Sequence, residues 1–186
     1  MSQLIVRQEV LITKSGISSN TDFNLINPSI ILVQELKLRP LLGTNLYNEI
    51  ITQTTPTVSL TPANLYLMNN YITPFMVCYV QSLAVNATKY RFSNIGPIYR
   101  DGAGQGVNAI SDIKAKELTD DHKNNAEAYG QLMIEYIKAH PSDYPAYFTN
   151  TGFGDVLPKN DAYDVQIYLP SSSYFGLTND TGELNV

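Results

Sequence analysis

The sequence predicts a mainly α-helical protein: a compact bundle of about four to five helices, with short β segments at the N-terminus and in an extended C-terminal arm. Three observations support this class. Asn or Thr followed by Pro occurs at Asn27, Thr61 and Thr73, the pattern of a capped helix start. Apolar residues then recur three or four positions apart, as on one face of a helix. Strand-like runs occur only near the two ends of the chain.

The chain divides into three predicted segments. Residues 1–26 form an N-terminal extended arm and loop, in which residues 4–12 read as a short β strand. Residues 27–148 form the helical domain. Residues 149–186 are rich in Gly, Pro, Ser, Asn and Asp, and form an extended C-terminal arm with one short strand at residues 163–169.

The first half of the helical domain contains several proline-marked boundaries. A helix begins at Asn27, and Pro40 is expected to end it because proline lacks an N–H and restricts the residue before it. A tight turn at Gly43 leads into a second helix over residues 44–52. A third helix follows Thr61, and Thr73-Pro74 either starts a new helix or kinks a long one.

The second half of the domain is built around two longer helices. Residues 75–90 are apolar nearly all round and predict the central core helix. A long loop with four glycines is expected over residues 93–108. Ser111 then caps a charged helix that runs to about Ala139, where His140-Pro141 stops it. Its middle, residues 119–125, is polar all round and is expected to face solvent or a neighbouring chain.

Composition excludes several classes of function. The net charge is −5, and Lys and Arg do not cluster, so electrostatic binding to the phosphates of a nucleic acid is not expected. Cys78 is the single cysteine, which excludes an intrachain disulfide and a multi-cysteine metal site. No apolar stretch is long enough for a membrane span, and residues 1–7 are not expected to be a signal peptide, because they lack a basic leader before a long apolar run. The chain has thirteen tyrosines and no tryptophan. Tyrosine combines a large apolar ring with a polar hydroxyl and is enriched at protein interfaces, so the composition favours a protein that contacts other proteins.

The candidate chemical sites are weak. The loop from Gly102 to Gly106 lacks the Lys-Ser/Thr of a phosphate loop and follows a helix, so it is expected to be a connector. Adjacent residues on a helix point about 100° apart, so Asp120-Asp121-His122 is expected to be a charged surface and not a metal site. We therefore expect no catalytic, cofactor-binding or metal-binding residue, and no enzyme activity.

The C-terminal arm is the most informative segment. Ordering it costs on the order of 1–2 kcal/mol per residue in backbone entropy. Its few apolar residues are not expected to offset that cost alone, so the arm is expected either to be disordered or to order against another chain. The predicted inter-subunit contacts are its apolar and aromatic residues: Tyr163, Val165, Ile167, Tyr168, Leu169, Tyr174 and Phe175.

Two short motifs carry a family resemblance. The first is Leu41-Leu42-Gly43-Thr44-Asn45-Leu46-Tyr47, which closes the first helix, and the second is the segment containing His140-Pro141 and Tyr144-Pro145-x-Tyr147. Over about residues 11–148 the chain resembles the head–tail connector (adaptor) proteins of tailed bacteriophages, especially those of crAss-like phages and other phages of gut Bacteroidetes. Residues 4–12 and the arm after residue 148 lie outside this resemblance.

The resemblance implies a structural virion protein made in the host bacterial cytoplasm. It implies a homo-oligomeric ring, typically dodecameric, at the portal–tail junction, with the portal protein and other tail or connector proteins as partners. DNA would pass through the ring without sequence-specific binding. The alternative is a small helical ligand-binding or regulatory adaptor protein that uses the flexible Gly-rich loop.

Overall fold

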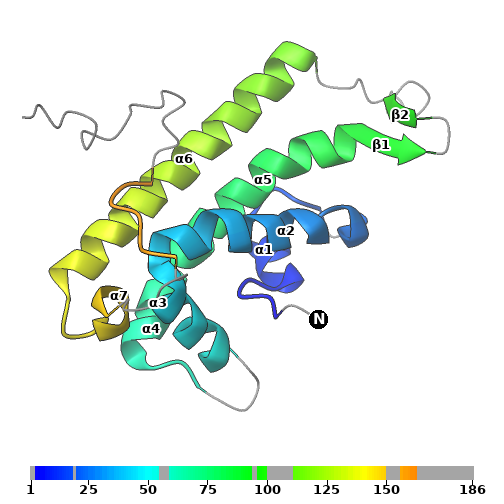
Figure 1. The fold of residues 1–186 in the computed structure, drawn as a ribbon. Coiled ribbons are helices and arrows are strands. Elements are labelled where there is room, and N and C mark those ends of the chain that lie inside the picture. The colour runs from blue at the N-terminus through cyan, green and yellow to red at the C-terminus, as the bar shows by residue number, and fades with distance from the viewer. Residues whose placement is uncertain are drawn as a thin grey trace, which may run out of the picture.

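The protein has the mainly α-helical fold that the sequence predicts, shown by a computed structural model in Figure 1. The structure describes residues 3–18, 20–54, 59–93, 96–99, 111–149 and 156–162. The two longest helices, α5 (Thr73–Lys89) and α6 (Asp112–Ala139), lie side by side and run in opposite directions. Of the separate elements that precede it, α1 (Gln8–Lys14), the 3₁₀ turn η1 (Phe23–Leu25) and α2 (Asn27–Val33) also contact α5. The central core helix is therefore α5, as predicted.

The predicted strand over residues 4–12 is wrong, because residues 4–7 form no strand and a helix begins at Gln8. Helix α1 spans Gln8–Lys14, and Leu11 is completely buried against the core. Ile5 and Val6, which precede the helix, are buried as well. A short apolar run does not by itself separate a strand from a helix, and packing against α5 decides between them here.

Two nearly continuous helical rods follow, each made of several elements. After the 3₁₀ turn η1 (Phe23–Leu25), the first rod consists of α2 (Asn27–Val33), the π-helical segment η2 (Gln34–Leu38) and α3 (Arg39–Gln53). The second rod consists of α4 (Pro62–Leu67), the π-helical segment η3 (Met68–Ile72) and α5.

The two π-helical segments explain how proline is tolerated inside each rod. Each segment ends two residues before a proline, Pro40 in one rod and Pro74 in the other. Proline lacks an N–H, and its ring clashes with the carbonyl four residues earlier in a regular helix. In the wider π turns, Arg39 N–H donates to Gln34 O and Thr73 N–H donates to Met68 O, five residues earlier in each case. This wider turn relieves the clash that a regular helix would have at the proline that follows. Thr73-Pro74 therefore lies within a long helix, and Pro40 does not end the first one.

The first rod breaks three residues later, at Gly43. Its φ of 72° and ψ of 161° are not helical, and no other described residue has a positive φ. A positive φ is the conformation that glycine adopts without a Cβ penalty. The turn predicted at Leu41-Leu42-Gly43 is thus confirmed, with the boundary set by glycine and not by proline.

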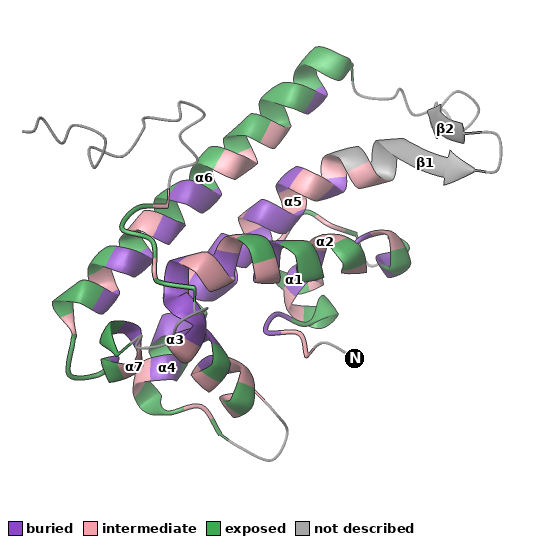
Figure 2. Cartoon of the chain, in the orientation of Figure 1, coloured by how far each residue is buried: buried purple, intermediate pink, exposed green. Residues whose placement is uncertain are grey.

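The predicted helix caps at Thr61 and Ser111 are confirmed, whereas the cap predicted at Asn27 is wrong, because Asn27 is the first residue of α2 and no side chain caps that helix. The Thr61 and Ser111 hydroxyls accept hydrogen bonds from the N–H groups of Asn64 and Lys114, at 3.2 and 3.4 Å, as side-chain N-caps. Helix α6 ends at Ala139 as predicted, and the short helix α7 (Pro145–Phe148) follows. Figure 2 shows that the buried residues gather along the sides where α5 meets α6 and α2.

Part of the loop predicted over residues 93–108 is regular. Strands β1 (Tyr90–Ser93) and β2 (Gly96–Tyr99) pair as an antiparallel hairpin, with Tyr90 opposite Tyr99. The hairpin follows directly from the end of α5.

Candidate interaction surfaces

The break at Gly43 frees two backbone groups that a continuous helix would pair. In a regular helix the N–H of Thr44 would bond to Pro40 O, four residues earlier. Here a segment from the other end of the chain satisfies both groups. Lys159 N–H donates to Pro40 O at 2.8 Å, and Thr44 N–H donates to Val156 O at 3.0 Å. Val156 N–H also donates to the Thr44 hydroxyl at 3.0 Å.

We call residues 156–162 the strap. Beyond the Gly43 break it crosses toward α6, where Ala162 N–H donates to Gln131 Oε1 at 3.4 Å. Its last described residue packs on Gly130. A Cβ at Gly130 would lie 2.8 Å from Ala162 Cβ, 3.1 Å from Phe75 and 3.2 Å from Leu41. Gly130 therefore allows the strap to approach α6 closely.

The strap changes the interpretation of the C-terminal arm. The sequence led us to expect that residues 149–186 are either disordered or order against another chain. Residues 156–162 instead pack on the chain's own α3 and α6, because the helix break offers paired backbone donors and acceptors. All seven predicted inter-subunit residues, from Tyr163 to Phe175, lie outside the described residues.

A stack of tyrosines joins α4, η3 and α6. The Tyr136 ring lies 5.2 Å from Tyr66 and 4.9 Å from Tyr71, nearly parallel to both, and 4.2 Å from the His140 ring. Burial raises the pKa of Tyr71, and the neighbouring tyrosines Tyr66 and Tyr136 raise it further. Tyr66 remains about half exposed (47%), so this stack presents an aromatic surface at the end of α6.

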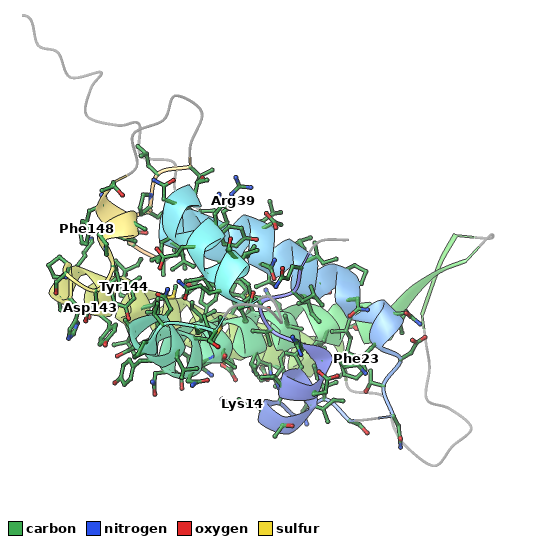
Figure 3. The ribbon with its side chains drawn as sticks, turned by 90° about the horizontal axis from the view of Figure 1, so that it is seen from below. Lys14, Phe23, Arg39, Asp143, Tyr144 and Phe148 are labelled. Carbon is green, nitrogen blue, oxygen red and sulfur yellow. The ribbon has the colours of Figure 1, made fainter. Side chains whose placement is uncertain are left out.

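The motif residues around His140 serve mainly to pack this end of the bundle. Figure 3 places Tyr144 near Asp143 and Phe148 at one end of the molecule, away from Lys14 and Phe23. The Tyr144 hydroxyl donates to Ala63 O at 2.8 Å, and burial raises its pKa. His140 Nδ1 lies 2.9 Å from Tyr136 O, inside its own helix end.

A buried polar network, which the sequence did not reveal, attaches the N-terminal segment. Gln34 is fully buried in η2; its Oε1 accepts from Ile5 N–H at 2.9 Å, and its Nε2 donates to Gln3 O at 2.9 Å. Nε2 also lies 3.1 Å from the Tyr47 hydroxyl, which donates to Glu35 Oε1 at 2.6 Å. Burial raises the pKa of Tyr47, and the Glu35 carboxylate raises it further.

Helix α6 carries four exposed apolar side chains in two groups, one on each side of its polar middle, and we call the four together the α6 row. Ile113 is 74% exposed and Leu132 50%, and Leu118 and Tyr129 are also exposed. Figure 2 shows the N-terminal half of α6 as largely exposed. Within the polar middle, Asp120 and Asp121 face solvent as predicted. Glu127, which sequence reasoning missed, is buried between Lys123 Nζ at 3.5 Å and the Tyr79 hydroxyl at 3.4 Å.

On the other side of the molecule a shallow groove of about 480 Å³ lies between the N-terminal segment and α4. Leu4, Val10, Leu60, Leu65 and Met68 supply its apolar lining. In Figure 1, α6 lies above α5, whereas the N-terminal segment and α4 lie below it. The exposed row on α6 and this groove are therefore separate surfaces.

The other candidate sites of the sequence remain without supporting geometry. Among the described residues no group of three His, Cys, Asp or Glu side chains could hold a metal ion. The Gly102–Gly106 loop lies outside the described part of the chain. Cys78 is half-buried, and burial raises the pKa of its thiol. No helix in the described ranges is both long and apolar enough to cross a membrane.

Comparison with known proteins gives a family match over most of the helical domain. Residues 38–155, more than half of the chain, match the model of a family described as a family of unknown function (DUF6712). No curated protein and no solved structure matches the chain. The match includes Gly43, the tyrosine stack and α6, and excludes the N-terminal segment and the strap.

Proposed function

The chain belongs to the DUF6712 family, whose function is unknown, and we propose that it is a structural subunit of a homo-oligomeric ring. In this proposal the ring is the head–tail connector of a tailed bacteriophage, situated in the virion at the portal–tail junction. It extends the DNA channel and docks tail proteins. The proposal rests on the exposed surfaces of the helical bundle together with the sequence resemblance given above.

The observation that carries the proposal is the exposed apolar row on α6. Ile113 and Leu132 lie 19 residues apart, which corresponds to roughly 29 Å of helix. The polar residues 119–125 divide these side chains into two small exposed apolar patches, and exposed aliphatic and aromatic side chains of this kind are typical of interaction sites. Tyr129, in the same row, supplies the amphipathic ring that interfaces favour.

A ring needs two different contact surfaces on each subunit, because head-to-tail contacts generate a cyclic assembly. The α6 row and the groove between the N-terminal segment and α4 provide such a pair. The acidic balance of the chain suits a channel through which DNA slides without specific binding.

Mass measurement of the full-length protein, alone and with the portal protein, tests the proposal. We expect a closed oligomer of defined mass, visible as a ring by negative-stain microscopy, in at least one of these samples. A protein that remains strictly monomeric and does not bind the portal protein contradicts the proposal.

Two further measurements separate the alternative functions. A ligand-binding module predicts that nucleotides or metal ions raise the melting temperature, whereas a ring subunit does not require this. A regulatory adaptor acts on a non-virion partner, so it is expected to be missing from purified virions. The connector proposal predicts the chain in virions, in stoichiometric amounts.

A further inference from the structure

The side chain of Gln34 holds the N-terminal segment by its backbone. Its Oε1 accepts from Ile5 N–H at 2.9 Å, and its Nε2 donates to Gln3 O at 2.9 Å. One side-chain amide thus pairs with the C=O of one residue and the N–H of the residue two positions later, as the peptide group of a neighbouring strand does. Because both partners are main-chain groups, Gln34 recognises a backbone and not particular side chains.

The fold fixes the orientation of this amide. Gln34 is completely buried, and its Nε2 also donates to the Tyr47 hydroxyl at 3.1 Å. That hydroxyl donates in turn to Glu35 Oε1 at 2.6 Å, and Arg39 pairs with Glu35 at 3.5 Å. Since the hydroxyl gives its hydrogen to the carboxylate, it offers Gln34 only an acceptor, which directs Nε2 toward it. If the segment left, a donor and an acceptor of a buried amide would lose their partners at a high cost, so the site needs an occupant.

Apolar side chains complete the attachment of this segment, defined here as residues 3–14. Ile5, Val6 and Leu11 are buried, with exposed fractions of 8%, 2% and 0%. The segment is followed by the hinge, residues 15–22, which reads Ser-Gly-Ile-Ser-Ser-Asn-Thr-Asp. Every hydrogen bond of the described hinge residues joins positions at most four apart in the sequence. The segment is therefore firmly bound, whereas hydrogen bonds hold the hinge only to itself and to its immediate neighbours.

We propose that neighbouring copies of the chain exchange the N-terminal segment, so that residues 3–14 of one copy bind at Gln34 of the next. A second copy is favoured as the source because its segment has the same sequence and repeats every contact that the chain makes with itself. The eight hinge residues span about 26 Å when extended, which is enough to cross from one subunit to another in contact with it. Exchange between two chains gives a dimer, and exchange passed from chain to chain closes a ring.

In its cyclic form the exchange rests on the proposed function and gives the subunit contact a built site. The groove between the N-terminal segment and α4 then has one wall from each of two chains, with Leu4 and Val10 from one and Leu60 and Met68 from the other. Such a contact is also slow to break, because the Gln34 amide loses two hydrogen bonds when the chains separate.

Cross-linking between two single-cysteine variants of the full-length chain tests the exchange. Both carry Cys78→Ala; one also carries Gln3→Cys and the other Thr54→Cys, positions whose native side chains meet at 3.2 Å. Neither variant has both cysteines, so a short bismaleimide can join the two positions only between chains. The variants are co-expressed, and oligomers are separated from monomers by size before the reagent is added.

The matched control combines Gln3→Cys with Asn125→Cys. Asn125 is exposed and lies on α6, on the other side of α5 from the N-terminal segment (Figure 1). In the oligomers we expect at least about tenfold more product joining Gln3→Cys to Thr54→Cys than joining Gln3→Cys to Asn125→Cys.

The outcomes separate the exchange from the proposed ring. Equal yields for the two pairs overturn the exchange. So does a ring in which the double variant Gln3→Cys/Thr54→Cys is joined only within each chain, and this result leaves the ring function intact. A chain-to-chain product found in dimers, with no ring in any sample, supports the exchange and contradicts the ring. A chain that is monomeric with and without the portal protein contradicts both.

The variant Gln34→Met tests the role of the amide. Methionine fills nearly the same volume, but it cannot donate to Gln3 O and accepts only weakly from Ile5 N–H. We expect amide exchange at Ile5 to become at least about tenfold faster, with the middle of α5 unchanged, and the chain-to-chain yield to fall by a similar factor. Gln8→Met, at an exposed position on α1, is the control and should change neither quantity. If Gln34→Met behaves like Gln8→Met, the amide does not hold the segment.

Discussion

The positive φ of Gly43 interrupts the first helical rod, and the backbone groups that this break leaves unpaired bind the strap, residues 156–162. A side chain in that conformation, which is essentially restricted to glycine, costs on the order of 1–3 kcal/mol, so we expect Gly43→Ala to destabilise the protein by about that amount. If the chain instead relaxes to a continuous helix, Thr44 N–H leaves Val156 O and the strap loses this contact. Urea unfolding measures the difference.

Gly16→Ala is the matched control for Gly43→Ala. A Cβ at Gly16 meets only Gln81 Nε2, at an ordinary 3.8 Å, and its φ is not positive. We expect its free energy of unfolding to stay within about 0.5 kcal/mol of the native value. Equal effects of the two substitutions would contradict the role given to Gly43.

Buried tyrosines make the stability sensitive to alkaline pH. Burial raises the pKa of Tyr47, Tyr71 and Tyr144 above the ordinary value of 10.0. Because the folded state binds these protons more tightly than the unfolded state, their stabilisation is fully present below pH 10.0 and is lost as the pH rises above it. We expect the free energy of unfolding to fall across that range.

The variant Tyr144→Phe checks the assignment of this alkaline loss. Removing the hydroxyl deletes the hydrogen bond to Ala63 O, which costs about 0.5–1.5 kcal/mol at neutral pH. It also removes one titrating group, so the decline above pH 10.0 becomes shallower. Parallel curves for the native protein and the variant would show that Tyr144 does not contribute to the pH dependence.

The helices were predictable where their signals are local. Thr61, Ser111 and Gly43 act through their own turn of backbone, so caps and the break could be placed from the sequence. The N-terminal helix was not predictable in the same way, because its apolar run fits a strand equally well until Leu11 meets the core. The hydrogen bonds of Gln34 and of the strap join residues far apart in the sequence, so no local sequence pattern predicts them.

The one sequence signal that marks the strap is a glycine inside a helix. Gly130 lies in the middle of α6, where glycine costs about 1 kcal/mol relative to alanine. That cost is offset by the close approach of Ala162. An isolated helical glycine of this kind indicates a packing reason even when the packing partner is unknown.

Gly130→Ala is therefore expected to displace the strap. The new methyl group lies too close to Ala162, Phe75 and Leu41 at once, and the overpacking penalty of about 1–3 kcal/mol outweighs the gain in helix propensity. The strap is the easiest partner to move. We expect faster amide exchange at Lys159 and Ala162, with the exchange in the middle of α5 nearly unchanged. Unaltered exchange at both strap amides would contradict this packing.

Assembly of the whole molecule depends on side chains that a single chain leaves exposed. Ile113 and Leu132 contribute little to folding, since they are 74% and 50% exposed. We expect Ile113→Glu and Leu132→Glu to change the free energy of unfolding of the isolated chain by less than about 0.5 kcal/mol. The same substitutions place a carboxylate in the proposed contact and weaken the oligomer, because burying an unpaired charge is costly.

Asn125→Glu is the matched control, because Asn125 is exposed on the same helix and is already polar. Mass measurement over a range of protein concentrations compares the three variants with the native chain, with and without the portal protein. Loss of assembly in Ile113→Glu and Leu132→Glu, but not in Asn125→Glu, assigns the contact to the apolar row of α6. If all three variants assemble like the native chain, α6 does not form the subunit contact, and the groove between the N-terminal segment and α4 then lacks the partner surface that a ring requires.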